Sequence, residues 1–102
     1  MSKSSSLQIG NKSFKNRLML GTGKYKSSDL MVNSLRSSNC EIVTVAVRRV
    51  SNDDDKENLM KFIDWSKYWM LPNTAGCTNA EEAIRIAMLG RELAKLSGQE
   101  NN

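Results

Sequence analysis

Residues 70–96 read M-L-P-N-T-A-G-C-T-N-A-E-E-A-I-R-I-A-M-L-G-R-E-L-A-K-L, and this stretch is the strongest indication of the architecture. Its pattern predicts the end of a strand, a tight polar loop and a long helix. Pro72, Asn73 and Gly76 are residue types that mark a turn. Backbone N–H groups and the helix dipole converge where such a loop meets a helix start, so α/β proteins bind ligands there.

The helix in this stretch has start and end signals of its own. Thr78 is followed three residues later by Glu81, which is the spacing of a capping box, and Gly98 is a residue type that ends helices. Apolar residues between these points recur at helical spacing and predict the buried face: Ala80, Ala83, Ile84, Ala87 and Met88.

The strands before this stretch begin with a hairpin. Leu7–Phe14 alternates apolar and polar residues around a Gly10-Asn11 turn. A short strand is expected at Arg17–Leu20 and a third one at Trp69–Leu71. Glu41–Val47 is β-branched and apolar on both faces, which is typical of a parallel strand covered on both sides.

Helices are expected between these strands. Ser27 or Ser28 can cap the first, which would end at Ser37–Asn39 and bury Leu30, Met31 and Leu35. The second follows the polar loop Ser51–Asp55 and would bury Leu59, Phe62 and Ile63. The resulting order β-α-β-α-β-α favours a parallel sheet, either a βα barrel or a doubly wound sheet. We expect one domain over residues 7–102 and a disordered N-terminus at residues 1–6.

Composition excludes several classes of protein. Of the 102 residues 39% are hydrophobic and 25% charged, which is typical of a small globular domain. The net charge of +4 is scattered, so we expect no nucleic-acid partner. The first six residues lack an apolar signal region, and the apolar run Ile42–Val47 is too short to cross a membrane. We therefore expect a soluble protein of a reducing compartment.

Cysteine and histidine content limits the chemistry further. Cys40 and Cys77 are the two cysteines and form no C-x-x-C pair, and the chain has no histidine. A zinc site and a histidine-dependent catalytic triad are not expected. Asp53–Asp55 lacks the pattern of a calcium loop and is interpreted as a solvated loop. We predict neither a metal nor a cofactor.

Candidate binding residues lie in loops and at strand ends, and each has a plainer interpretation. The glycine-rich loop Gly21–Tyr25 matches neither a Walker A loop nor a Rossmann fingerprint, so it is either a structural turn or a ligand contact. Lys24 could be a nucleophile or an exposed lysine. Arg49 could hold a phosphate or carboxylate, or form a structural ion pair. Cys77 could be an activated thiol, but a small buried side chain is the simpler interpretation.

Several motifs occur in order and in one frame: Gly21–Tyr25, Val45–Val50, Leu71–Cys77, Ala80–Ile84 and Gly90-Arg91-Glu92. Together they resemble the N-terminal part of bacterial and plastid thiazole synthases, which build the thiazole ring of thiamine. The resemblance runs from about Leu7 to the last residue.

The resemblance implies that the chain is about three βα units of a (β/α)₈ TIM barrel, preceded by the hairpin. It implies condensation of 1-deoxy-D-xylulose 5-phosphate, dehydroglycine and sulfur from a thiocarboxylated sulfur-carrier protein. In the family a lysine forms an imine, or Schiff base, with the ketone of the sugar phosphate, and acidic residues move protons. The resemblance also implies a sulfur-transferring, homo-oligomeric enzyme of the cytoplasm or the plastid stroma.

The same resemblance places the imine lysine beyond Asn102, so no catalytic residue is assigned in this chain. Lys95 lies in the predicted helix and is not that lysine. Three strands cannot close a barrel and leave two open edges, so we expect the 102 residues alone to be poorly stable or to aggregate, and to be inactive. The substrate-binding candidates are small or polar residues at strand ends: Thr22, Gly23, Arg49, Asn73 and Thr74.

Two other functions stay open at this point. The chain could be a non-catalytic α/β module that binds a phosphate metabolite or the sulfur-carrier protein. It could also be a small basic nucleic-acid binder, whose affinity would depend on salt. A reading frame that continues past Asn102 into a strand with the lysine would favour the thiazole synthase interpretation.

Overall fold

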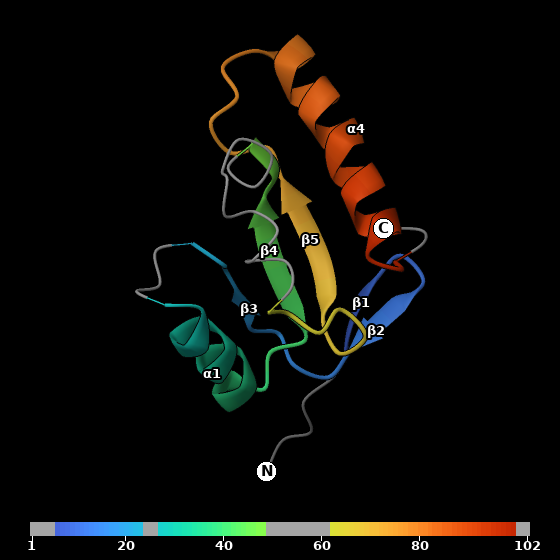
Figure 1. Cartoon of the computed structure of the whole chain (residues 1–102). Helices are drawn as coiled ribbons and strands as arrows, with labels where there is room; N and C mark the ends of the chain where they lie inside the picture. The colour runs from blue at the N-terminus through green and yellow to red at the C-terminus, as the bar shows by residue number, and fades with distance from the viewer. Residues whose placement is uncertain (1–5, 24–26, 49–61, 100–102) are drawn as a thin grey trace.

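The computed structural model describes residues 6–23, 27–48 and 62–99. Within them a two-stranded hairpin precedes a three-stranded parallel sheet in the order β3-β4-β5, with helices α1 and α4 packed against it (Figure 1). The expected α/β class and parallel sheet are confirmed. The predicted loop Ser51–Asp55 and the helical position Leu59 lie outside the described residues.

The hairpin forms where the sequence predicts it. Strand β1 covers Leu7–Ile9, strand β2 covers Lys12–Phe14, and they pair antiparallel. Gly10 has φ 60°, a conformation that glycine adopts without steric cost, at the first position of the two-residue turn. Figure 1 shows the hairpin beside the end of the sheet where β5 begins. Phe14 is buried and so attaches the hairpin to the rest of the protein.

Strand β4, Ile42–Ala46, is the centre of the sheet and contains Val43 and Val45, both fully buried. It pairs in parallel with β3, Met19–Leu20, on one side and with β5, Trp69–Asn73, on the other. Strand β3 is shorter than the sequence predicts. The reason is local, because the Leu18 N–H bonds to the Asn16 side chain at 2.7 Å instead of joining the sheet.

Helix α1, Ser28–Ser38, is capped as the sequence predicts. The Ser27 hydroxyl oxygen accepts a hydrogen bond from the Leu30 N–H at 3.2 Å, and Asn39, with φ 57°, ends the helix. Met31 and Leu35 are buried as expected, but Leu30 is 49% exposed. Leu30 precedes Met31 by one residue, a rotation of about 100° on a helix, which turns its side chain away from the sheet.

Strand β5 continues further than the sequence predicts. Pro72 and Asn73, expected in the turn, belong to the strand and pair with Val45 and Ala46 of β4. The Trp69 N–H donates to the Glu41 carbonyl at 2.8 Å, so residues 69, 71 and 73 direct their backbone groups toward β4. Residue 72 then faces the opposite edge, where a proline removes no bond to β4.

Helix α4, Ala80–Leu96, begins one residue later than the predicted capping box. Its N-cap is Asn79, whose side-chain oxygen accepts from the Glu82 N–H at 2.8 Å, and the prediction of Thr78 is wrong. The helix ends as expected, since Gly98, with φ 87°, and Gln99 donate their N–H groups back to the Lys95 and Ala94 carbonyls.

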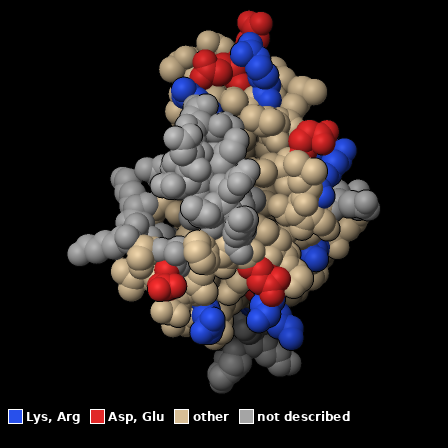
Figure 2. All heavy atoms as spheres, viewed as in Figure 1, with Lys and Arg blue, Asp and Glu red and all other residues tan. Residues whose placement is uncertain are grey.

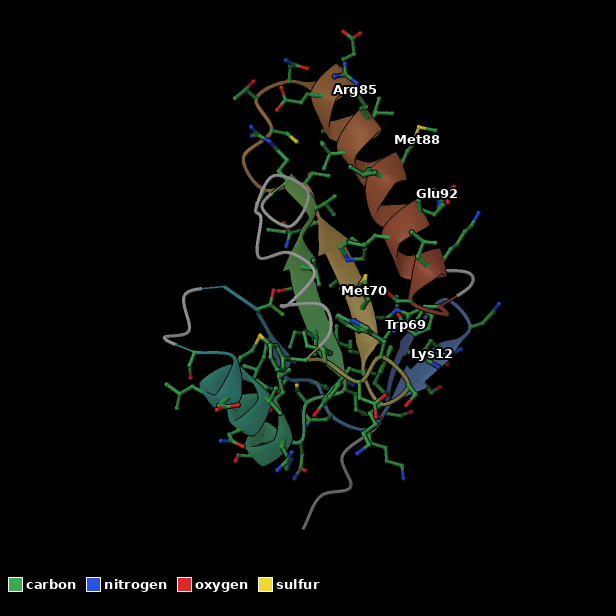
Figure 3. All side chains as sticks on the ribbon, viewed as in Figure 1. Lys12, Trp69, Met70, Arg85, Met88 and Glu92 are labelled. Atoms are coloured by element: carbon green, nitrogen blue, oxygen red, sulfur yellow. The ribbon has the colours of Figure 1, made fainter. Side chains whose placement is uncertain are left out.

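The face of α4 that packs on the sheet differs from the predicted one. Gly90 and Ala94 are buried, whereas Ile84 is 62% and Met88 65% exposed. Figure 3 shows Met88 and Glu92 projecting away from β5. The cause is the contact at Gly90, where an added Cβ would lie 2.8 Å from the Pro72 Cβ, so the helix approaches the sheet at its smallest residue.

Two side chains of the predicted second helix lie in the described part of the chain. Phe62 and Ile63 occupy a turn rather than a helix. Ile63 is buried as predicted and joins Met31, Leu35 and Val43 in one core cluster, whereas Phe62 is largely exposed.

Candidate functional site

Strands β3, β4 and β5 end at the same edge of the sheet because they are parallel, and the described loops after β3 and β5 start there. Four of the five predicted substrate-binding residues occur there, in the loop after β3 or at the end of β5: Thr22, Gly23, Asn73 and Thr74. Arg49, the fifth, lies outside the described residues. Their assignment to substrate stays a prediction.

The loop after β3 is tied to the central strand. The Thr22 hydroxyl donates to the Thr44 carbonyl at 3.1 Å, so this side chain holds the loop against β4. A Cβ added at Gly21 would lie 3.4 Å from the Thr44 hydroxyl oxygen, an ordinary contact. Gly23 follows as an exposed residue whose backbone can face a ligand.

The loop after β5 is a compact turn. The Asn73 side-chain oxygen accepts from the Ala75 N–H at 3.0 Å, and the Thr74 carbonyl accepts from the Cys77 N–H at 3.1 Å. Gly76, with φ 89°, occupies the third position of the turn from Thr74 to Cys77, where a type II turn requires a positive φ. Asn73 therefore shapes the loop, and its amide nitrogen is the part of the side chain that the turn does not use.

Arg48, two residues after the end of β4, reaches across to this turn. Its Nη1 donates to the Gly76 carbonyl and lies 3.6 Å from Oε1 of Glu82 in the first turn of α4. A Cβ at Gly76 would lie 2.8 Å from the same nitrogen, but that nitrogen ends a flexible side chain that can shift, so the turn needs glycine for its φ rather than for space. Sequence reasoning favoured Arg49 and missed Arg48 and Glu82. The sequence signal that could have indicated Arg48 is the pair of arginines, Arg48 and Arg49, near a strand end. For Glu82 the only sequence signal is its position in the first turn of the predicted helix.

Cys77 lies beside these charges. Burial raises the pKa of its thiol, the carboxylate of Glu82 raises it further, and Arg48 acts in the opposite direction. The thiol is therefore protonated at neutral pH, which speaks against an activated thiol. The side chain is half-buried rather than buried as the sequence interpretation had it.

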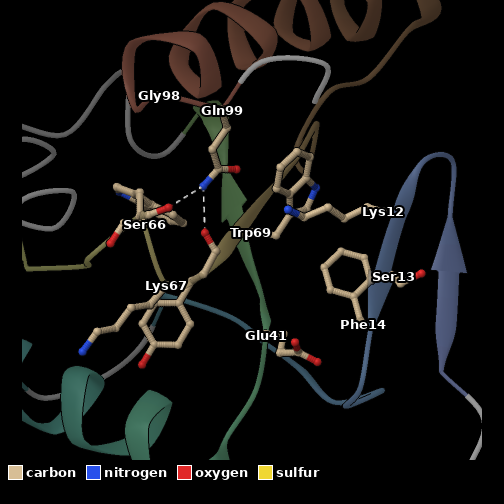
Figure 4. Close-up of a pocket in the computed structure, with 11 residues that line it drawn as sticks. Lys12, Ser13, Phe14, Glu41, Ser66, Lys67, Trp69, Gly98 and Gln99 are labelled. Carbon is tan, nitrogen blue, oxygen red and sulfur yellow. Dashed lines mark hydrogen bonds between the residues drawn. The ribbon is translucent and has the colours of Figure 1, made fainter.

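The opposite end of the sheet contains a cavity of about 440 Å³ (Figure 4). Its lining includes Phe14, Glu41, Trp69 and Gln99, and the Lys12 Nζ lies 4.7 Å from the centre of the Trp69 ring. Strands begin at this end, whereas the sites of βα proteins lie where strands finish.

Other kinds of site find no support in the described parts of the chain. No group of three or more Cys, Asp and Glu side chains within residues 6–23, 27–48 and 62–99 could hold a metal ion. None of the helices described is long and apolar enough to cross a membrane. On the face shown in Figure 2, the described basic and acidic side chains are interspersed, with no continuous basic surface.

The fold and the strand-end loops define an α/β protein with its candidate site at the carboxyl edge of a parallel sheet. The model of the family described as "Thiazole biosynthesis protein ThiG" matches residues 8–98, so the chain belongs to this family. A thiazole synthase of Prochlorococcus marinus strain MED4 is 68% identical over all 102 residues, which are 38% of that protein. The thiazole synthase of Prochlorococcus marinus strain MIT 9312 is also 68% identical over 102 residues, which are 39% of that protein.

Proposed function

We propose that these residues form part of a thiazole synthase that makes the thiazole phosphate of thiamine. The observation that carries the proposal is the family match over residues 8–98, which includes both described strand-end loops of the candidate site. The chain spans about 38% of the length of the MED4 relative, so the reaction requires groups that the rest of such a protein would supply.

In this proposal the sheet is one side of a (β/α)₈ barrel and the described loops form part of its mouth. The substrates are 1-deoxy-D-xylulose 5-phosphate, dehydroglycine and the thiocarboxylate of a sulfur-carrier protein. A lysine on a strand after α4 forms the imine, and acidic side chains move the protons. A homo-oligomer, as the resemblance implies, is the proposed assembly.

The described loops contribute binding groups to this reaction. Asn73 is the last residue of β5, and Thr74, the first residue after this strand, is half-buried. We assign Thr22, Gly23, Arg49, Asn73 and Thr74 to the substrate pocket, with Arg48 holding the 74–77 turn in place through the Gly76 carbonyl. Hydroxyl, amide and backbone N–H groups of this kind suit the oxygens of a sugar phosphate.

The test is a chimera in which residues 1–102 are followed by the part of the MED4 relative that this chain does not cover. We expect the chimera to form thiazole phosphate from the three substrates, and the 102 residues alone to form none. The unaltered MED4 protein is the positive control. A folded chimera that forms no product while the MED4 protein does would overturn the proposal.

Variants of two loop threonines test the pocket. Thr74→Val should raise the KM for the sugar phosphate by roughly tenfold, the effect of about one lost hydrogen bond to a charged group. Thr78→Val is the matched control, because Thr78 is exposed at the far end of the same loop. Equal kinetics for the two variants would remove Thr74 from the pocket. If the folded chimera binds the sugar phosphate but does not turn it over, the result would support the alternative that the chain is a non-catalytic binding module.

A further inference from the structure

Strand β5 is the last strand of the described sheet, and its outer edge has an unusual pattern of N–H groups. Trp69 directs its N–H toward β4, where the Glu41 carbonyl accepts it. Alternate residues of a parallel strand face opposite sides, so Met70 and Pro72 face the outer edge. These two positions decide how another strand could pair with β5.

The N–H at the first of these positions is already bonded to a side chain. The Met70 N–H donates to the side-chain oxygen of Gln99 at 2.7 Å. The amide nitrogen of the same side chain donates to the Trp65 carbonyl at 3.1 Å and to the Tyr68 carbonyl at 2.7 Å, as the dashed lines in Figure 4 show. Gln99 is 5% exposed, so its amide is fixed in one orientation.

The second position has no N–H at all, because residue 72 is a proline. The outer edge of β5 therefore offers a new strand no N–H at residue 70 or 72, while the Pro72 carbonyl faces that edge. Helix α4 brings the chain back to the starting end of β5 at Gly98 and Gln99. A right-handed crossover from there places the next strand beside β5.

We propose that Gln99 sets the register of a further parallel strand on the outer edge of β5, by occupying the Met70 N–H in place of a backbone carbonyl. The new strand then pairs through its own N–H to the Pro72 carbonyl. The occupant to which we commit is the next strand of a longer thiazole synthase chain, because this chain spans 38% of its MED4 relative. The inference rests on the proposed function only for the identity of this strand.

The test uses the chimera described above and NMR couplings across hydrogen bonds. We expect the Met70 amide nitrogen to couple to the side-chain carbonyl carbon of Gln99. An amide nitrogen of the following strand should couple to the Pro72 carbonyl carbon. Coupling of the Met70 nitrogen to a backbone carbonyl of the following strand would overturn the proposal. This measurement needs no variant and so does not depend on whether one folds.

Gln99→Met supplies a second measurement, because it keeps the side-chain length and removes the three hydrogen bonds. Amide exchange of the strand bonded to Pro72 should accelerate by at least roughly tenfold, the equivalent of one lost hydrogen bond, while the Trp69 amide stays protected. Gln8→Met is the matched control, since Gln8 is an exposed glutamine of β1. Unchanged exchange next to Pro72 in a folded Gln99→Met chimera would overturn the proposal. A chimera with both couplings but no thiazole product would instead overturn the proposed function alone.

Discussion

The two ends of the parallel sheet are held together by different kinds of contact. At the starting end, side chains that are buried or half-buried bond to backbone groups distant in sequence. The Glu41 carboxylate accepts from the N–H groups of Lys15 and Asn16 at 2.5 and 2.7 Å. The Gln99 side chain bonds to the Met70 N–H of β5 and to the Tyr68 carbonyl in the turn before it. At the finishing end, the turn after β5 is closed mainly by bonds within itself and by the partly exposed Arg48.

This contrast indicates where the fold keeps its stability and where it leaves room for chemistry. Removing Glu41 or Gln99 at the starting end leaves at least two backbone groups without their partner, and for Gln99 one of them is the buried Met70 N–H, which is costly. Removing one at the finishing end frees a loop that water can solvate. In the barrel that we propose, this division corresponds to the separation of stability and catalysis between the two faces of the fold. Variants at each end test the division.

The largest effect is expected for Gln99→Met at the starting end. The substitution leaves the Met70 N–H and two carbonyls without their side-chain partner, so the free energy of unfolding should fall by about 3 kcal/mol. Urea unfolding of the chimera measures the change, and Gln8→Met should shift the midpoint little. If Gln99→Met lowers the free energy of unfolding no more than Gln8→Met does, the starting end does not carry more of the stability than the finishing end.

A smaller effect is expected where α4 meets the sheet, at Gly90→Ala. The new Cβ would lie 2.8 Å from the Pro72 Cβ and 3.0 Å from the Val47 Cγ2, and neither atom is the end of a flexible side chain. We expect a net loss of roughly 1–2 kcal/mol, since overpacking outweighs the gain in helix propensity. Ala87→Gly at an exposed position of the same helix measures propensity alone. Stabilisation by Gly90→Ala would show that the close approach is dispensable.

Local sequence patterns predicted the elements of this fold better than their packing. The valines of β4, the glycine of the hairpin and the serine cap of α1 impose their conformations locally, and these predictions are confirmed. The prediction of which face of α4 packs on the sheet was wrong. Ile84 and Met88 are more apolar than Gly90 and so were expected to be buried, but the close approach of the helix to Pro72 requires the smaller residue at the contact. Propensity gives no signal for such a contact between distant segments.

For the candidate site, too, the sequence predicted the positions of residues but not the contacts between distant ones. Turn residues and the strand order place Asn73 and Thr74 at the carboxyl edge, because parallel strands end together. The bond from Arg48 to Gly76 joins residues 28 positions apart, and the Met70–Gln99 bond joins residues 29 apart. Neither has a periodic pattern in the sequence, so only the folded chain reveals them.

A weaker effect on stability is expected for Arg48→Met at the finishing end. The guanidinium is 39% exposed in its pair with Glu82, so its loss should lower the free energy of unfolding by less than about 1 kcal/mol. The turn at residues 74–77 should nevertheless become less protected from amide exchange, because the Gly76 carbonyl loses its donor. Urea unfolding and exchange on the chimera measure the two quantities. A loss equal to that of Gln99→Met would contradict the comparison between the ends.

The smallest effect concerns the thiol of Cys77. Burial and then the Glu82 carboxylate raise the pKa of this thiol, so alkylation should be slower at pH 8 than for an ordinary exposed cysteine. Glu82→Gln removes the negative charge and should lower the pKa, which speeds alkylation at the same pH. Glu81→Gln, at an exposed neighbour in the same helical turn, is the control.

Because the folded state raises the pKa of Cys77, it favours the protonated thiol. The associated stability is fully present below the pKa of the unfolded state and is lost as the pH rises through the folded pKa. Glu82→Gln should therefore move this loss to lower pH, whereas Glu81→Gln should leave it in place. Peptide mass spectrometry after timed iodoacetamide treatment from pH 7 to 10 gives the titration of Cys77. Identical titrations for the two variants would mean that the Glu82 carboxylate has no specific effect on the Cys77 thiol.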